Sequence, residues 1–214
     1  MNEEETAPSE PSAYENLRKV SDARELRALA HPVRMALYEA FALHRSLTAT
    51  QAAKLVGGTP SSVSYHLRTL AKYGYVEETN EGTGRERPWR MRQIGYSFSD
   101  NSDDPETNAA AQALSRLLFR RWLDRYEEFR RTKDRWPADV REVAGNSNMI
   151  VFGTAEEVEA LQADISRLFG EYFDRVADPT LRPEGSYAFE LQLFTQPVDP
   201  SAFAPEGGPA AQEN

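Results

Sequence analysis

Two short helical segments joined by a very tight turn constrain the fold of this chain more than any other feature. The first, TATQAAKLVGG, opens with Thr48 and has Gln51 three residues later, which is the spacing of a capping box. It ends at Gly57 and Gly58, because glycine readily adopts the left-handed conformation that terminates a helix. Thr59 is placed to cap the next helix. Two helices with so little chain between them predict a helix-turn-helix.

The second helix of this motif runs from Pro60 to about Tyr73, where Gly74 stops it. At roughly 100° per residue its larger apolar residues fall within about 60° of one another, so this stripe is predicted to be buried. The stripe consists of Val63, Leu67 and Leu70.

The opposite face of this helix is predicted to be exposed and to meet DNA. Short hydroxyl side chains let a helix backbone approach DNA closely and bond to base edges or phosphates. Arginine can bond to guanine through two hydrogen bonds or contact a phosphate. The residues assigned to DNA contact on this helix are Ser61, Ser62, Ser64, Tyr65, Arg68 and Lys72.

A β-hairpin is predicted directly after this helix. The segments YGYVEE and PWRMRQ alternate as two strands, and the polar, glycine-rich TNEGTGRER between them predicts a long tip. Trp89 is expected to pack the hairpin onto the helices. The arginines of the tip and second strand suit contact with the phosphate backbone or a minor groove. They are Arg85, Arg87, Arg90 and Arg92.

Charge is unevenly distributed along the chain, whose formal net charge is -9 at pH 7. Residues 1–16 carry five acidic and no basic side chains, residues 17–95 carry 13 basic and 7 acidic, and residues 96–214 carry 12 basic and 22 acidic. The basic middle is a better guide to an anionic partner than the whole-chain value. Double-stranded DNA is therefore the predicted partner.

The helices before the helix-turn-helix complete a family pattern. SDARELRALAHPVRMALYEAF predicts two helices divided by Pro32, the first opened by Asp22 with Glu25 three residues on. This segment, SSVSYHLRTLAKYGYVEE and GTGRERPWRM together resemble winged-helix transcriptional regulators of the arsenical-resistance-repressor (ArsR) type, especially the branch common in high-GC actinobacteria. The resemblance covers about residues 17–95.

The resemblance implies homodimers that bind operator DNA, mostly as repressors. It also implies that Ser61, Ser64 and Tyr65 occupy the positions that enter the major groove. Pro60 stands where many relatives have a base-reading Gln, and Tyr65 replaces a frequent His. The operator sequence of relatives therefore does not transfer to this chain.

The chemistry available to the chain is narrow. There is no cysteine, so disulfides and thiolate metal sites are excluded, and His44 and His66 are interpreted as ordinary polar or half-buried residues because zinc needs three or four convergent ligands. No metal site is expected, since the ligand patterns of metal-sensing relatives are not present. No phosphate-cradle, nucleophile-elbow or H-E-x-x-H motif occurs, so neither catalysis nor a cofactor is expected. The acidic N-terminus and the lack of a long apolar run predict a cytoplasmic protein without membrane contact.

A long helix is predicted in the second half, within AAAQALSRLLFRRWLDRYEEFRRTKDRW. Its apolar residues recur at intervals of three or four. This stripe predicts either core packing or a helix that packs against its two-fold mate. Dimerisation is favoured because an exposed stripe of this width would promote aggregation. The stripe consists of Leu114, Leu118, Trp122, Tyr126 and Phe129.

A small strand-helix-strand unit is predicted to follow. NMIVFGT and SYAFELQLFT predict strands on either side of a helix that Thr154 caps, with Glu157 three residues on. Its aromatic residues predict either plain core, which is favoured, or the lining of a pocket for an unidentified small-molecule effector. They are Phe152, Phe169, Tyr172, Phe173, Tyr187, Phe189 and Phe194.

The predicted fold class is α+β and mainly helical, with a winged helix-turn-helix domain, a long dimerisation helix and the small strand-helix-strand unit. The predicted function is a sequence-specific DNA-binding transcriptional regulator, a homodimeric repressor on an inverted-repeat operator. The alternative is a winged helix that docks an acidic protein partner. The predicted segments are an acidic disordered tail at 1–15, the DNA-binding domain at 16–96, a linker at 97–108, the dimerisation and effector unit at 109–196 and a disordered tail at 197–214.

Overall fold

The structure is a computed structural model that describes residues 18–82, 86–92 and 95–198. The predicted tail at 1–15 and nearly all of the predicted tail at 197–214 lie outside these residues. Among the described residues, no helix combines the length and the apolar character needed to cross a membrane.

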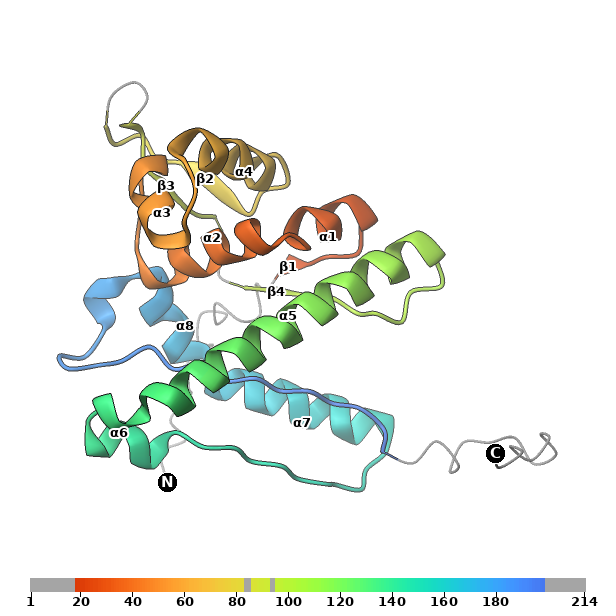
Figure 1. The fold of residues 1–214 in the computed structure, drawn as a ribbon. Helices are drawn as coiled ribbons and strands as arrows, with labels where there is room; N and C mark the ends of the chain where they lie inside the picture. Colours follow the sequence, from red (N-terminus) through yellow and green to blue (C-terminus); the bar gives the residue numbers. More distant parts are fainter. Residues whose placement is uncertain (1–17, 83–85, 93–94, 199–214) are drawn as a thin grey trace, which may run out of the picture. The chain divides into compact units, whose positions relative to one another are not determined.

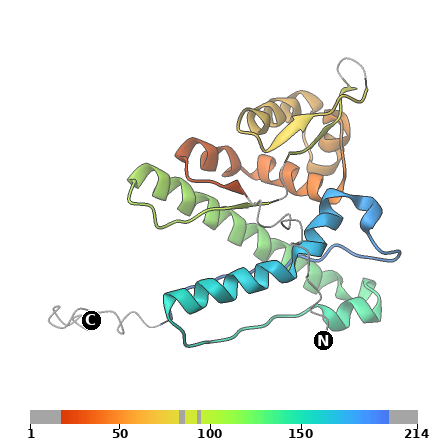
Figure 2. The ribbon, with the colours of Figure 1, turned by 180° about the vertical axis from the view of Figure 1, so that it is seen from behind.

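The described chain forms two compact units, of which the first ends at Pro183 and the second begins at Glu184. All the described helices and strands belong to the first unit, and helices predominate (Figures 1 and 2). The fold is α+β and mainly helical, as predicted. The helices are α1 (Ala23–Leu29), α2 (Pro32–Leu43), α3 (Ala49–Val56), α4 (Pro60–Lys72), α5 (Pro105–Thr132), α6 (Ala138–Val143), α7 (Ala155–Leu168) and α8 (Gly170–Ala177), with short 3-10 helices η2 (Lys133–Arg135) and η3 (Pro179–Leu181). The strands are β1 (Arg18–Lys19), β2 (Val76–Glu78), β3 (Trp89–Met91) and β4 (Tyr96–Ser97).

Side-chain caps set the limits of α3 and α4 as the sequence predicts. The Gln51 N–H donates to Thr48 Oγ1 (3.2 Å) and the Thr48 N–H donates to Gln51 Oε1 (2.8 Å), which completes the capping box. Gly57 ends α3 with a φ of 81°, in the left-handed region. Thr59 Oγ1 then accepts the N–H of Ser62 at 3.2 Å. The predicted helix-turn-helix is confirmed.

Half of the predicted capping box of α1 forms. Asp22 accepts hydrogen bonds from two N–H groups of the first turn. The Glu25 carboxylate instead pairs with Arg18, at 2.7 Å. Arg18 also donates to the carbonyl of Tyr73 and lies over the ring of Tyr75. These contacts hold β1 against the end of α4.

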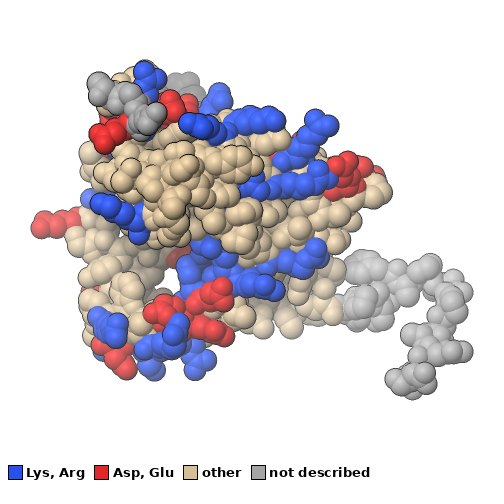
Figure 3. Space-filling model, turned by 45° about the horizontal axis from the view of Figure 1, so that its top comes forward, with Lys and Arg blue, Asp and Glu red and all other residues tan. Residues whose placement is uncertain are grey.

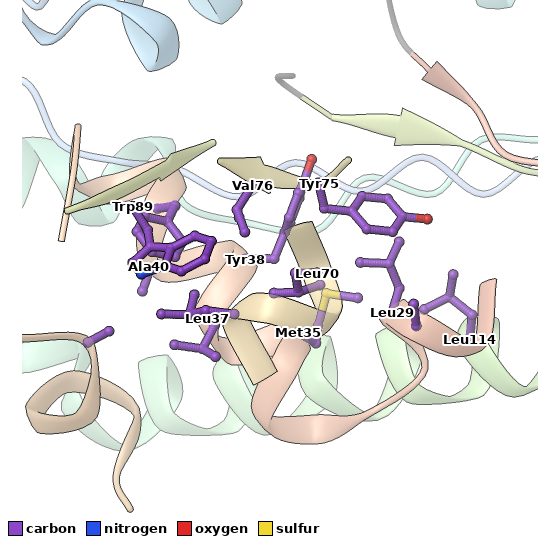
Figure 4. Close-up of a cluster of buried hydrophobic side chains, with 14 of the residues drawn as sticks. Leu29, Met35, Leu37, Tyr38, Ala40, Leu70, Tyr75, Val76, Trp89 and Leu114 are labelled. Carbon is purple, nitrogen blue, oxygen red and sulfur yellow. The ribbon is translucent and has the colours of Figure 1, made fainter. Parts of the chain in front are cut away.

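A single apolar core joins the first four helices, the hairpin and the start of α5 (Figure 4). The stripe predicted for α4 lies in it: Val63 is 1% exposed, and Leu67 and Leu70 are 0% exposed. Burying one such side chain stabilises a fold by about 1.5–3 kcal/mol, so the stripe determines which way α4 faces.

The predicted antiparallel hairpin forms from β2 and β3, with Glu77 opposite Arg90. Trp89 is 7% exposed, and its backbone exchanges two hydrogen bonds with Leu47, at 2.8 and 2.9 Å. The residues before α3 thus add a third backbone segment to the hairpin. A short parallel pair, β1 with β4, lies elsewhere in the unit. Neither addition was predicted, because such short pairings leave no alternating pattern in the sequence.

The long helix α5 begins at Pro105, inside the segment 97–108 that we expected to be a linker. Asp104 caps it by accepting the hydroxyl (2.6 Å) and the N–H (2.9 Å) of Thr107, and these hydrogen bonds lower the pKa of Asp104. The first turns of α5 pack on α1 and bury Leu114 completely. The start of α5 therefore belongs to the same core as the helix-turn-helix.

The predicted strand-helix-strand unit is present only in its helix. That helix forms as α7, with the predicted capping box between Thr154 and Glu157. The two predicted strands are wrong: residues 148–154 and 186–195 have no strand structure. A strand pattern predicts a face that a neighbouring element buries. Side chains in both segments are largely exposed instead, and Phe152 is fully exposed.

Truncating a buried leucine of α4 should cost far more stability than truncating an exposed leucine of α3. We expect Leu67→Ala to lower the free energy of unfolding by about 2–5 kcal/mol, because it removes buried methyl groups and leaves a cavity. Leu55 is 53% exposed. Leu55→Ala should therefore change the free energy of unfolding by less than about 0.5 kcal/mol. Urea unfolding followed by circular dichroism measures both, and equal losses would contradict the packing of α4.

Candidate nucleic-acid interface

The outer side of α4 gathers the predicted DNA-contacting residues of this helix on one surface. Tyr65 is 67% exposed, Ser64 is half-buried and the other four are exposed. They share this surface because the opposite side of the helix is held in the core. We call it the α4 face, and it consists of Ser61, Ser62, Ser64, Tyr65, Arg68 and Lys72.

The α4 face is positively charged. No residue of α4 is acidic, so the positive N-terminal end of the helix dipole and the cations Arg68 and Lys72 act in the same sense. The Lys72 ammonium lies 5.4 Å from the centre of the Tyr73 ring. Figure 3 shows Lys and Arg side chains spread over the side of the molecule that carries α4 and the hairpin, with Asp and Glu mainly at its margins. Such a surface suits a polyanion.

Two histidines and an arginine pack between α2 and α4, beside Tyr65. The rings of His31 and His66 lie 4.7 Å apart, and Tyr65 meets His66 edge-on at 5.4 Å. His31 also caps α2, since its Nδ1 accepts the N–H of Val33 at 3.2 Å. Arg34 follows in the first turn of α2. These contacts support the α4 face from within the protein, and no motif in the sequence predicted them.

This cluster favours neutral histidines. Burial, and then the charge of Arg34, lower the pKa of His31. Burial, His31 and Arg34 lower the pKa of His66. Among the described residues, His66 Nδ1 and Arg34 Nε are buried without a hydrogen-bond partner. Protonation would also remove the lone pair with which His31 caps α2.

The hairpin contributes further arginines, which glutamates partly neutralise. Arg90 pairs with Glu77 at 2.8 Å, and Arg87 lies 3.9 Å from Glu78. The predicted contact Arg85 lies outside the described residues. No glutamate partner was predicted for Arg87 or Arg90, although the strand register places Glu77 opposite Arg90. Exposed pairs contribute at most about 1 kcal/mol, so a phosphate can displace the glutamates at little cost.

Helix α2 joins the α4 face to the rest of the first unit. Glu39 accepts hydrogen bonds from Arg121 and Arg125 of α5, both at 3.0 Å. Arg182 donates to the carbonyls of Leu43 (3.3 Å) and Ala42 (3.5 Å) at the end of α2. These contacts were not predicted from the sequence, because they join residues at least 82 positions apart and no local pattern marks them.

The stripe predicted on α5 is partly core and partly surface, so core packing applies to its first part and dimerisation stays a prediction for its later part. Leu114 is buried and Leu118 packs against the core, as the packing interpretation predicts. Farther along, Trp122, Tyr126 and Phe129 are half-buried, and the rings of Trp122 and Tyr126 stack 5.7 Å apart. The later part of the stripe thus lies outside the core and retains surface for a partner.

Most of the aromatic residues assigned to a core or an effector pocket are exposed. Phe169 and Phe173 are half-buried and meet edge to face at 6.5 Å. The others are 48–101% exposed. They are Phe152, Tyr172, Tyr187, Phe189 and Phe194. Within the described part of the chain, no three His, Asp or Glu side chains lie close enough together to hold a metal ion.

Comparison with known proteins agrees with the geometry of the α4 face. Residues 29–79 match a family described as a helix-turn-helix domain. This span runs from the end of α1 through β2 and includes the whole α4 face. No curated protein matches the chain. The match supports a DNA-binding regulator and ends before β3.

The histidine cluster predicts a loss of stability in mild acid. Both histidines have lowered pKa values in the folded state, so their contribution is complete above the ordinary histidine pKa of about 6.5 and is lost as the pH falls below it. We expect the urea concentration at the midpoint of unfolding to decrease when the pH is lowered from about 7.5 to about 5.5. His31→Asn keeps an N-cap acceptor but does not titrate, so it should weaken this pH dependence.

His44→Asn is the matched control, because His44 is exposed at the end of α2. Its pH dependence should equal that of the wild type. If the urea midpoints of His31→Asn and His44→Asn decrease equally as the pH is lowered, the cluster does not control stability in acid.

Proposed function

We propose that this protein is a sequence-specific transcriptional regulator that inserts the α4 face into a major groove of DNA. The observation that carries the proposal is the α4 face itself, which holds short hydroxyls, a tyrosine and two cations outward on a helix without acidic residues. The helix-turn-helix match over residues 29–79 supports it independently.

The side chains of the α4 face have different roles in this proposal. Ser61 and Ser64 allow the helix backbone to approach the base edges, and Tyr65 bonds to bases through its hydroxyl. Arg68 and Lys72 neutralise phosphates at the rim of the groove. Ser62 is exposed beside the N-terminus of the helix, where a phosphate is favoured.

The hairpin acts as a wing along the neighbouring backbone. Arg87 and Arg90 exchange their glutamate partners for phosphates when DNA binds. Arg85, at the tip, is assigned the same role from the sequence. The wing adds affinity that depends little on base sequence.

The protein acts as a homodimer on an inverted repeat. One α4 face reads a single half-site, and two copies place their faces in successive major grooves about 34 Å apart. The later part of α5 supports a dimer contact, since Leu123 is 47% exposed beside the half-buried stripe. Repression, a cytoplasmic location and control by a small-molecule effector are proposed from the ArsR-type resemblance and the composition.

Selection of genomic fragments by the purified protein, followed by fluorescence anisotropy on a selected duplex, tests the proposal. We expect the selected duplex to bind at least about a thousandfold more tightly than random DNA. Contact with about six phosphates should weaken binding by about a thousandfold between 50 and 200 mM salt. Salt-sensitive binding to acidic polypeptides, with no preference among DNA sequences, would favour a protein-docking module instead.

Two substitutions on the α4 face should affect binding differently. Arg68→Ala should weaken binding to selected and random duplexes alike and make log K less dependent on salt, because it removes a phosphate contact. Tyr65→Ala should reduce the preference for the selected duplex by about 1–3 kcal/mol, since it removes a base contact. Arg116→Ala, at an exposed position in the first half of α5, is the control and should change neither. Unchanged selectivity in Tyr65→Ala would show that Tyr65 does not read bases.

A further inference from the structure

The exposed apolar side chains of the first unit are concentrated after the middle of α5. Before α5, the described residues expose only three large apolar side chains, Leu43, Leu55 and Tyr65. Residues 123–181 expose many more, to between 39 and 101%. They include Leu123, Val143, Met149, Ile150, Val151, Phe152, Leu161, Leu168, Tyr172 and Leu181.

The cause is that the apolar core ends early in α5. Leu114 is its last fully buried member, with Leu117 and Leu118 packed on its edge. Beyond these residues, Val140 is the one buried large apolar side chain of the described chain. The region from residue 119 onward therefore has apolar surface but almost no interior, which is unusual for a soluble monomer.

Two parts of this region present apolar surface along helices. Leu161 and Leu168 lie seven residues apart on one face of α7, and Tyr172 follows on α8; the three are 45–74% exposed. We call this set the α7 stripe. The second part is the later half of α5 around Leu123.

The charges beside these two parts are opposite. Residues 119–136 carry seven basic and four acidic side chains, and two of the basic ones, Arg121 and Arg125, pair with Glu39 of the same chain. Residues 155–178 carry two basic and seven acidic side chains. Each chain thus offers a basic helix and an acidic helix, both with exposed leucines. A two-fold symmetric dimer can pair the basic helix of each copy with the acidic helix of the other.

We propose that the later half of α5 in one copy packs against the α7 stripe of a second copy, and reciprocally. The proposal rests on the homodimer of the proposed function, but it does not depend on DNA recognition. It differs from packing α5 against its own two-fold mate, because like charges would then face each other.

The exposed area of residues 123–181 is sufficient for such an interface when the segment 149–152 takes part in it. At roughly 150–200 Å² for each fully exposed large side chain, the ten residues named above offer on the order of 1,000 Å² per copy. A stable interface buries about 800 Å² on each partner. The continuous segment 149–152, which is 59–101% exposed, supplies a large share of this area.

Light scattering and sedimentation equilibrium on the full chain test the proposal. The wild type should be a dimer, and Leu168→Glu should raise its dissociation constant at least about tenfold, because it places a charge in the centre of the interface. Leu55→Glu is the matched control, since Leu55 is exposed on α3. It should leave the dissociation constant unchanged.

Circular dichroism checks the fold of each variant. If Leu168→Glu unfolds, Glu159→Lys replaces it: Glu159 is exposed on α7, and reversing its charge should also weaken the dimer at least about tenfold. A monomeric wild type, or variants that stay dimeric, would overturn the interface. Variants that lower the melting temperature without changing the dissociation constant would show that the chain covers its own α7 stripe, which also overturns it.

Anisotropy with the selected duplex on the same samples separates this proposal from the proposed function. A variant that becomes monomeric and binds a single half-site weakly supports both. A wild-type dimer that shows no sequence preference, with variants that dissociate, supports the interface and overturns the proposed function.

Chemical coupling identifies which helices meet. Lys133, at the end of α5, is the only lysine after Lys72, so a zero-length reagent that joins amines to carboxylates has one amine in this region. In mixtures of isotopically light and heavy copies, we expect Lys133 of one copy to couple to carboxylates of α7 or α8 in the other. Cross-links that join only residues of the same copy would contradict the proposed contact between α5 and the α7 stripe.

Discussion

Burial of Val63, Leu67 and Leu70 is the constraint on which the rest of the structure depends, because it fixes the rotation of α4 about its own axis. Turning the helix by one residue, roughly 100°, would expose the stripe and bring the cations of the α4 face toward the core. Exposing three such side chains would cost on the order of 5 kcal/mol, a large part of the stability of a typical domain. The hydroxyls and cations are therefore held outward by contacts on the other side of the helix.

Helix α2 transmits this placement to the other elements. It meets α4 through His31 and His66, α5 through Glu39, and the chain after α8 through Arg182. A change in how α5 packs, as in assembly with a second copy, would therefore reach the α4 face through α2 and through α1, which contacts both α5 and α4. The wing is less constrained, because its arginines rest on exposed glutamates that phosphates can displace.

Local patterns predicted the helix-turn-helix correctly. The capping box of Thr48 and Gln51 depends on residues three positions apart, and the α4 stripe on residues three or four apart. A short stretch of sequence is therefore enough to predict both. The ion pairs of Glu39 and the pairing of Leu47 with Trp89 join distant residues and left no such signal. The strands predicted at 148–154 and 186–195 were wrong. An alternating pattern indicates that a segment has an apolar face, but it does not indicate which neighbouring element, if any, buries that face.

Amide hydrogen exchange of the full chain, with and without a DNA fragment selected by the protein, tests the central claim most directly. If the α4 face enters a groove, DNA should slow exchange in α4 and in β3, while α7 should be unaffected. The claim is contradicted if DNA binds and α4 exchanges as in the free protein, with protection confined to the residues after α5.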